Sequence, residues 1–283
     1  MPLAPIANQY HPPRLQIGPQ DSGTRQQEAL LTQGWARVAR KVGARDAGGI
    51  TVDSFRDLLG RIAPHVIDDL SDHEWYREFN IDLPVANDPV DVVLRANAVA
   101  KEMRDCGVRL VGVFSEPLLE GKFNRLVGGT RNKAVVSLGL AMRIVERVAS
   151  VADGSTVHVF VDRQGGRQRY GPALMTAFDH RHLEILAESE TRSAYRLDRN
   201  PGPATIEFLT DGEDRKMPIA LASLFSKYLR ELFMLAFNAY WADRVEGLRP
   251  TAGYYQDAKR FLVDIAPALE RSGIGRDSLV RTR

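Results

Sequence analysis

The stretch that decides the fold is residues 218–241, P-I-A-L-A-S-L-F-S-K-Y-L-R-E-L-F-M-L-A-F-N-A-Y-W. Its apolar residues cover most of a helical surface, so the stretch predicts one long, largely buried helix. Ser223, Lys227 and Glu231 recur every four residues, with Arg230 beside them, and therefore share one face. Unpaired Lys and Glu side chains are costly in apolar surroundings. This polar stripe must be paired, hydrated or part of a site.

A second acidic residue ends a predicted strand at 156–162, T-V-H-V-F-V-D. Asp162 is followed at once by R-Q-G-G-R-Q-R, so glycines and arginines surround its carboxylate. This combination suits a divalent cation that meets a phosphate group. Asp before glycine is also common at an ordinary turn. Together with the polar stripe, the pattern favours a site.

Length and composition set broad limits on the protein. The chain has 283 residues and 44% hydrophobic content, enough for one large domain or one domain with an appendage. The net charge of +2 does not identify a partner. Local clusters of basic residues predict a phosphate-binding patch, although such loops also occur on ordinary solvated surfaces. The clustered residues are Arg163, Arg167, Arg169, Lys216, Lys227 and Arg230.

Cysteine usage and hydropathy bear on location. Cys106 is the single cysteine, which excludes an intramolecular disulfide and a cysteine-rich zinc site and favours a reducing compartment. The sequence has no run of 18 apolar residues, and residues 1–20 contain prolines in place of a signal-peptide pattern. We therefore expect a soluble, cytoplasmic protein with no membrane partner. Protein partners are not indicated.

The remaining elements follow from periodicity and turn signals. We expect a loose tail at 1–23, a helical N-terminal region at 24–107 and a main domain at 108–283. Helices are predicted at 24–42, 51–62, 90–106, 132–151 and 256–269, and an ordered loop at 69–89. Strands are predicted at 108–114, 156–162, 191–197 and 204–209. Asn200-Pro-Gly predicts that the last two form a hairpin.

Several motifs occur in the order found in type 2 ribonuclease H (ribonuclease HII). The segment A-S-L-F-S-K-Y-L-R-E at 222–231 resembles the family's A-S-[IV]-x-A-K-x-x-R-D, with Glu231 at the place of the last aspartate. Val161-Asp162 resembles its V-D-G strand end, and Gly253-Tyr254 its G-Y-x-T segment. Residues 111–117 and 123–124, with the helix that follows, are similar to its V-G-x-x-S-x-x-E-I-D-x-x-N segment. The resemblance covers roughly 108–269.

The resemblance implies an α/β fold: a ribonuclease H-like mixed sheet flanked by helices, here with a helical N-terminal extension. It implies metal-dependent hydrolysis of RNA in RNA/DNA hybrids with two Mg²⁺ or Mn²⁺ ions. Asp162 and Glu231 would be the catalytic and metal-binding residues. Expected substrate-binding residues are Arg167, Ser223, Lys227, Arg230 and Tyr254. Lys227 equally suits an intrahelical pair with Glu231, and Tyr254 a place in the core.

The chain departs from the family pattern in one major respect, because the D-E-A-G-R-G-P strand that supplies two further acids is not found. Candidate replacements are Glu188, Glu190, Glu207, Asp211 and Glu213, each of which also suits a solvated loop or edge strand. Three hypotheses therefore stand. The chain is a divergent active nuclease, a catalytically inactive nucleic-acid-binding relative, or an N-terminally truncated chain.

Overall fold

The computed structural model describes residues 52–281, with short gaps at 109, 151–155, 179–181 and 199–201. The predicted tail at 1–23 and the predicted helix at 24–42 lie outside the described residues.

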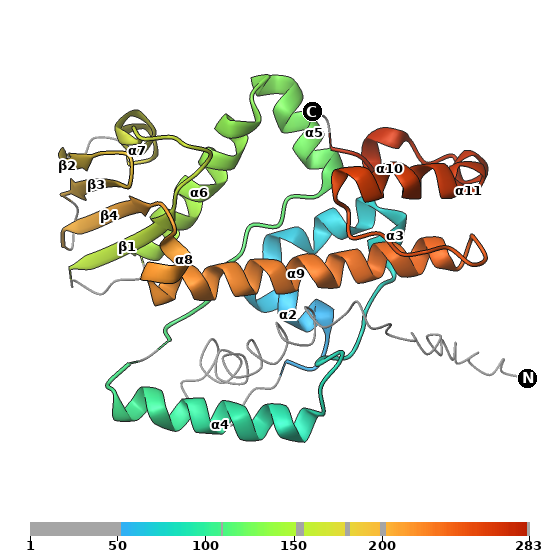
Figure 1. Ribbon diagram of the computed structural model, residues 1–283, viewed down its shortest axis with the longest axis horizontal. Coiled ribbons are helices and arrows are strands. Elements are labelled where there is room, and N and C mark those ends of the chain that lie inside the picture. Colours follow the sequence, from blue (N-terminus) through green and yellow to red (C-terminus); the bar gives the residue numbers. More distant parts are fainter. Residues whose placement is uncertain (1–51, 109, 151–155, 179–181, 199–201, 282–283) are drawn as a thin grey trace, which may run out of the picture.

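Within the described residues, four strands form one mixed sheet in the order β1-β4-β3-β2 (Figure 1). The strands are β1 (Val157–Asp162), β2 (Leu183–Glu188), β3 (Arg192–Leu197) and β4 (Ala204–Leu209). β1 and β4 are parallel, whereas β4 with β3 and β3 with β2 are antiparallel. The strands predicted at 156–162, 191–197 and 204–209 are confirmed, and the last two are antiparallel neighbours as a hairpin requires. Asn200 and Pro201 of the predicted turn lie outside the described residues. β2 was not predicted.

The sheet is covered by α6 (Lys133–Ser150) and α7 (Gly171–Ala177), which close a first hydrophobic core. Tyr170, just before α7, stacks on Phe208 of β4 with ring centroids 3.6 Å apart and nearly coplanar rings. Tyr195 of β3 packs edge-on against the same phenylalanine. Alternate residues of β4 point into this core, which fits the two-residue period of a strand. The helix predicted at 132–151 is confirmed as α6.

The long predicted helix is confirmed as α9 (Met217–Ala242), which follows the short α8 (Gly212–Arg215). Its apolar faces are buried in a second core with α2 (Phe55–Ile62), α3 (Glu74–Arg77) and α10 (Tyr255–Asp264). Phe55 of α2 packs edge-on against Phe233 of α9 at 5.2 Å, and Trp75 against Phe237 at 5.3 Å. The Ser54 side chain caps α2 by accepting from the Asp57 N–H, as expected for the helix predicted at 51–62.

The second core contains residues from both sides of the predicted boundary at 107/108. Phe55, Trp75 and Tyr76 precede that boundary, yet they pack against aromatic side chains of α9. The sheet with α6 and α7 forms its own cluster within the predicted main domain. The helical N-terminal region therefore shares its core with the long helix, which runs between the sheet at one end and α3 at the other (Figure 1).

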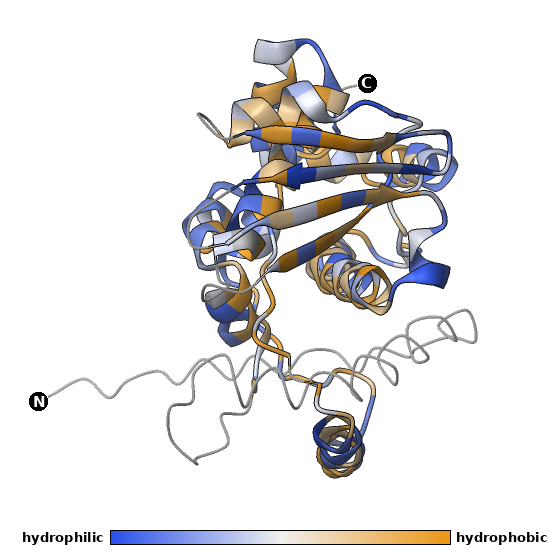
Figure 2. Ribbon diagram, turned by 90° about the vertical axis from the view of Figure 1, so that its left-hand side faces the viewer, coloured by the Kyte–Doolittle hydropathy of each residue, from blue (hydrophilic) through white to orange (hydrophobic). Residues whose placement is uncertain are grey.

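The remaining helices complete the described chain. They are α4 (Pro89–Asp105), α5 (Glu120–Thr130) and α11 (Ala266–Ser272), with short 3₁₀ turns at Pro64–Val66, Asp68–Asp72 and Arg276–Ser278. α4 confirms the helix predicted at 90–106 and lies apart from the sheet and α9 (Figures 1 and 2). No helix of the described chain combines the length and apolar content needed to cross a bilayer.

Three predicted elements differ from the structure. The described residues of 108–114 form no strand, because Leu110 and Val113 pack against the helical core instead of pairing with a neighbour. The helix predicted at 256–269 is divided into α10 and α11 near Ile265, since Pro267 cannot donate the next helical hydrogen bond. The predicted loop at 69–89 contains the second 3₁₀ turn and α3.

Candidate functional site

Two carboxylates lie where adjacent parallel strands end. Asp162 is the last residue of β1 and pairs in register with Leu209, the last residue of β4; Thr210 and Asp211 follow. The carboxyl ends of parallel strands open at the same edge of a sheet, which is where ligands bind in open α/β folds. Asp162 and Asp211 therefore lie at one edge of the sheet, although they are 49 positions apart in sequence.

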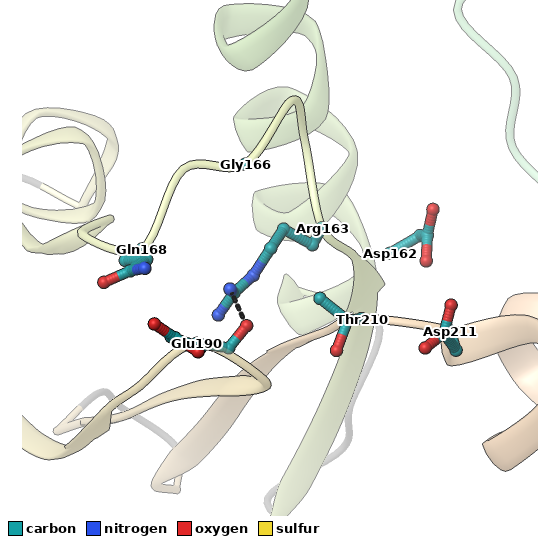
Figure 3. A pocket seen from close by; sticks show the side chains of 7 residues that line it. All are labelled: Asp162, Arg163, Gly166, Gln168, Glu190, Thr210 and Asp211. Carbon is teal, nitrogen blue, oxygen red and sulfur yellow. Dashed lines mark hydrogen bonds between the residues drawn. The ribbon is translucent and has the colours of Figure 1, made fainter.

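An open hollow of about 430 Å³ lies at these strand ends (Figure 3). In Figure 3, Asp162 and Asp211 lie beyond the strand ends on one side, and Gln168 and Glu190 lie on the other. Its lining residues are Asp162, Arg163, Gly166, Gln168, Glu190, Thr210 and Asp211. We call this the strand-end hollow.

The chain turns sharply after β4, and this turn places Asp211. Asp211 has a left-handed backbone (φ 50°, ψ 38°), which aspartate tolerates better than most residues. The next residue, Gly212, is buried against Asp162 and α9. A Cβ at this glycine would lie 2.6 Å from Ile219 Cδ1 and 3.1 Å from Asp162 Oδ1. The absence of a side chain thus lets the turn approach both the β1 carboxylate and the first turn of α9.

Neither carboxylate has an ion-pair partner among the described residues. The three other acids in this region behave differently. Glu207 is 2.7 Å from Arg192, Glu213 bonds Ser223 and Lys227, and Glu188 accepts from the Tyr195 hydroxyl at 2.6 Å. Of the candidate replacement acids, Asp211 and Glu190 therefore lie in the strand-end hollow with Asp162.

Glu188 serves the structure of the sheet. Burial and the hydrogen bond to Glu188 raise the pKa of Tyr195 to about 12. The same hydroxyl accepts from the Tyr170 N–H at 2.8 Å and so anchors the end of the loop that follows β1. Glu188 thereby fixes this loop relative to β3.

Arg163 lines the strand-end hollow and connects the end of β1 to the β2–β3 turn. Its guanidinium donates to the backbone carbonyls of Ser189 (2.7 Å) and Glu190 and to the Ser193 hydroxyl (3.3 Å). It therefore brings a positive charge to the hollow while its position is fixed by the β2–β3 turn. Arg167, a predicted substrate-binding residue, is half-buried on the same loop between two lining residues and does not line the hollow itself.

The polar stripe of α9 is paired in its first half. Ser223 donates to Glu213 Oε1 at 2.7 Å, and Lys227 Nζ is 3.3 Å from Oε2 of the same carboxylate. The hydrogen bond from Ser223, with the charge of Lys227, lowers the pKa of Glu213. Glu213 of α8 thus pairs with two residues of the polar stripe. Lys227 forms its ion pair with Glu213 and not with Glu231.

Glu231 lies away from the strand-end hollow. Ile219 is the α9 residue near Asp162, and Glu231 follows it by 12 residues, which is about 18 Å along a helix axis at 1.5 Å per residue. Glu231 is paired with Arg230, whose Nη1 is 2.8 Å from its Oε1. The expected sharing of one cation by Asp162 and Glu231 is therefore not what the structure presents. The acid that lies with Asp162 at the strand ends is Asp211.

Arg230 connects the stripe to the segment after α9. It donates to the Ala252 carbonyl, and its guanidinium lies 4.8 Å from the ring centre of Tyr254. Tyr254 is 68% exposed, so it is not a core residue. Arg230 and Tyr254 form one cationic and aromatic surface, remote from the strand-end hollow.

The segment that carries Tyr254 is held by Asp257. This carboxylate accepts from the Thr251 hydroxyl at 2.6 Å, the Ala252 N–H at 2.7 Å and Arg260 at 2.7 Å. Partial burial opposes its charge, but the hydrogen bonds from Thr251 and Arg260 prevail and lower the pKa of Asp257.

Because its pKa is lowered on folding, charged Asp257 stabilises the native state above the unfolded carboxyl pKa of about 3.9. That stabilisation is lost as the pH falls through the lowered folded value. We therefore expect Asp257→Asn to reduce the free energy of unfolding at pH 7, and the difference from the unmodified chain to shrink below about pH 4. Urea denaturation of both proteins at several pH values measures this. An equal difference at pH 7 and pH 3 would contradict it.

The carboxylates of the strand-end hollow are the groups there that could hold a hard cation. No group of three His, Cys, Asp or Glu side chains within the described ranges is arranged to hold a metal. Mg²⁺ commonly binds proteins through one or two carboxylates and completes its shell with water and substrate phosphate. Asp162 and Asp211 suit that mode of binding. The described acids do not assemble the richer ligand set that the two-metal expectation requires.

Comparisons of the chain with protein-family models, with curated proteins and with solved structures found no match.

Proposed function

We propose that this chain is a metal-dependent nuclease that hydrolyses the RNA strand of RNA/DNA hybrids at the strand-end hollow. The observation that carries the proposal is the position of Asp162 and Asp211 at the ends of adjacent parallel strands. Neither carboxylate has an ion-pair partner in the described chain. The choice of substrate rests on the motif resemblance at 222–231 and 253–254.

Asp162 and Asp211 would hold one Mg²⁺ or Mn²⁺. A bound ion of this kind polarises a phosphoryl oxygen and lowers the pKa of bound water. The two carboxylates fix its place at the sheet edge, and Arg163 adds a positive charge that the Ser189 and Glu190 carbonyls keep in position.

Residues outside the hollow would bind the rest of the hybrid. Arg167 extends the basic loop next to the hollow, and Lys227 and Arg230 follow along the exposed side of α9. Cationic side chains bind phosphates without reading sequence, and an exposed tyrosine adds a surface for a sugar or base. In this arrangement Ser223 orients Glu213, and Glu213 orients Lys227.

A second candidate function is a nucleic-acid-binding protein without catalysis. It is favoured by the position of Glu231, which is paired with Arg230 about 18 Å along α9 from Ile219. Such a protein would keep the basic and aromatic surface but would not turn over substrate. Its binding would weaken steeply with salt, because phosphate contacts release counterions.

A cleavage assay separates the two candidates. The purified chain is incubated with an end-labelled RNA/DNA hybrid in Mg²⁺, in Mn²⁺ and in EDTA. The Asp162→Asn variant is assayed under the same conditions. The nuclease proposal expects cleavage of the RNA strand with either ion, none in EDTA and none by the variant. Salt-sensitive binding without cleavage by the unmodified chain would establish the binding protein instead. Undiminished cleavage by Asp162→Asn would exclude the strand-end hollow as the active site.

A further inference from the structure

Next to the contact between Arg230 and Tyr254, a second tyrosine is also exposed at the protein surface. Tyr254 and Tyr255 are the aromatic side chains that are exposed among the described residues, at 68% and 50%. The described tryptophans and phenylalanines are buried or half-buried. Large aromatic side chains with this much exposed surface, at consecutive positions of the chain, are typical of a contact surface.

Each of the two rings has its own cation. Arg230 lies 4.8 Å from the Tyr254 ring centre, and Lys259 Nζ lies 4.3 Å from that of Tyr255. Lys259 is one helical turn after Tyr255 in α10, so the pair shares a helix face. Exposed rings accompanied by cations are the combination with which proteins bind unpaired nucleotides: the rings stack on bases while the cations attract phosphates.

The segment that presents the rings is fixed before any ligand arrives. Thr251 is buried and exchanges two hydrogen bonds of 2.9 Å with the Asn238 side chain of α9. Asp257 binds Thr251 and Ala252 from the first turn of α10. Gly253 then turns the chain with φ 73°, a conformation that favours glycine. A rigid platform loses little conformational entropy on binding, which favours affinity.

The spacing along α9 between the two tyrosines and the strand-end hollow can be estimated. The hydrogen bonds of Asn238 with Thr251 and of Arg230 with Ala252 show that the segment after α9 runs back along this helix, as Figure 1 also shows. Arg230 follows Ile219 by 11 residues, or about 16 Å along the axis. At the 3.4 Å rise per nucleotide of a strand within a duplex, this spacing along α9 corresponds to about five base pairs of hybrid.

We propose that Tyr255 and Lys259 form a stacking site for a base of an unpaired strand, next to Tyr254 and about five base pairs of hybrid from the strand-end hollow. This inference rests on the proposed function for its choice of nucleic acid as the ligand. It adds a single-stranded region to the substrate: a hybrid with an unpaired extension on one side would engage the protein better than a blunt hybrid.

Fluorescence anisotropy of a labelled 12-nucleotide single-stranded DNA, in EDTA and low salt, tests the stacking site without any cleavage. Tyr255→Ala is expected to weaken binding by about tenfold, within the range found for loss of one base–aromatic stack. Tyr255→Phe keeps the ring and is expected to bind like the unmodified chain. Ile185→Ala removes an exposed apolar side chain from β2 and serves as the control.

Equal affinity of Tyr255→Ala and the unmodified chain, or no binding by the unmodified chain, would overturn the stacking site. Equal loss in Tyr255→Ala and Tyr255→Phe would overturn it as well, because the ring would not be the cause. Failure of the nuclease proposal looks different: the Tyr255→Ala effect on binding persists, but no hybrid is cut in Mg²⁺. Circular dichroism of each variant confirms that the fold is retained.

Discussion

Asp211→Asn is expected to lower Mg²⁺-dependent cleavage of an RNA/DNA hybrid by more than about a hundredfold, since changes even in the outer shell of a metal site cost 10–100-fold. The substitution removes one of the three carboxylates that line the strand-end hollow, the one that lies with Asp162 at the strand ends. Asparagine tolerates the left-handed backbone of this position as aspartate does, so the turn into α8 is retained. Initial cleavage rates at saturating Mg²⁺, with thermal unfolding monitored in parallel, measure the effect.

Glu207→Gln is the matched control for this variant. Glu207 is a carboxylate of β4, the strand that Asp211 follows, but it is paired with Arg192 at 2.7 Å and does not line the hollow. Its substitution is expected to leave the cleavage rate within about twofold, because charge loss away from the ligand set changes neither cation nor substrate contacts. Cleavage by Asp211→Asn at the rate of the control would show that Asp211 holds no essential ion.

Phe55→Ala is expected to destabilise the whole chain by about 3–5 kcal/mol, the usual cost of truncating a buried phenylalanine. Phe55 is fully buried and packs edge-on against Phe79 and against Phe233 of α9. Its removal opens a cavity between the N-terminal helices and the long helix that also supports the sheet. Urea denaturation followed by tryptophan fluorescence and by far-ultraviolet circular dichroism measures the change.

Leu94→Ala is the control for the core variant, because Leu94 of α4 is an apolar side chain that is 62% exposed. It is expected to change stability by less than about 0.5 kcal/mol. If Phe55→Ala were equally mild, the N-terminal helices would not be an integral part of the core around α9. Two separate unfolding transitions would likewise show that the two cores fold independently.

The long helix and the central strands were predictable because their signals are local. The apolar stretch 218–241 has the composition of a buried helix whatever it packs against, and α9 spans Met217–Ala242. The run that ends at Asp162 has the β-branched and apolar residues of a strand, and Asn200-Pro-Gly is a strong turn signal in the sequence. Pairing of the polar stripe was one of three outcomes that the sequence allowed, beside hydration and a place in a site, since an unpaired lysine in apolar surroundings is costly.

The partner of Asp162 was not predictable from local signals. Asp211 precedes a glycine and has the composition of an ordinary turn; only the parallel pairing of β1 with β4 brings it to Asp162. Motif order pointed to Glu231 instead, but motif order carries no information on how far along α9 a residue lies from the sheet. β2 was missed because its edge position leaves several of its side chains exposed, which weakens the alternating pattern.

The central claim is that Asp162 and Asp211 share one divalent cation, and titration with Mn²⁺ followed by electron paramagnetic resonance tests it most directly. The account predicts one bound ion per chain, displaced by Mg²⁺, with affinity lowered at least about tenfold in both Asp162→Asn and Asp211→Asn and unchanged in Glu231→Gln. Unaltered Mn²⁺ binding by the first two variants, or its loss in Glu231→Gln, would contradict the account.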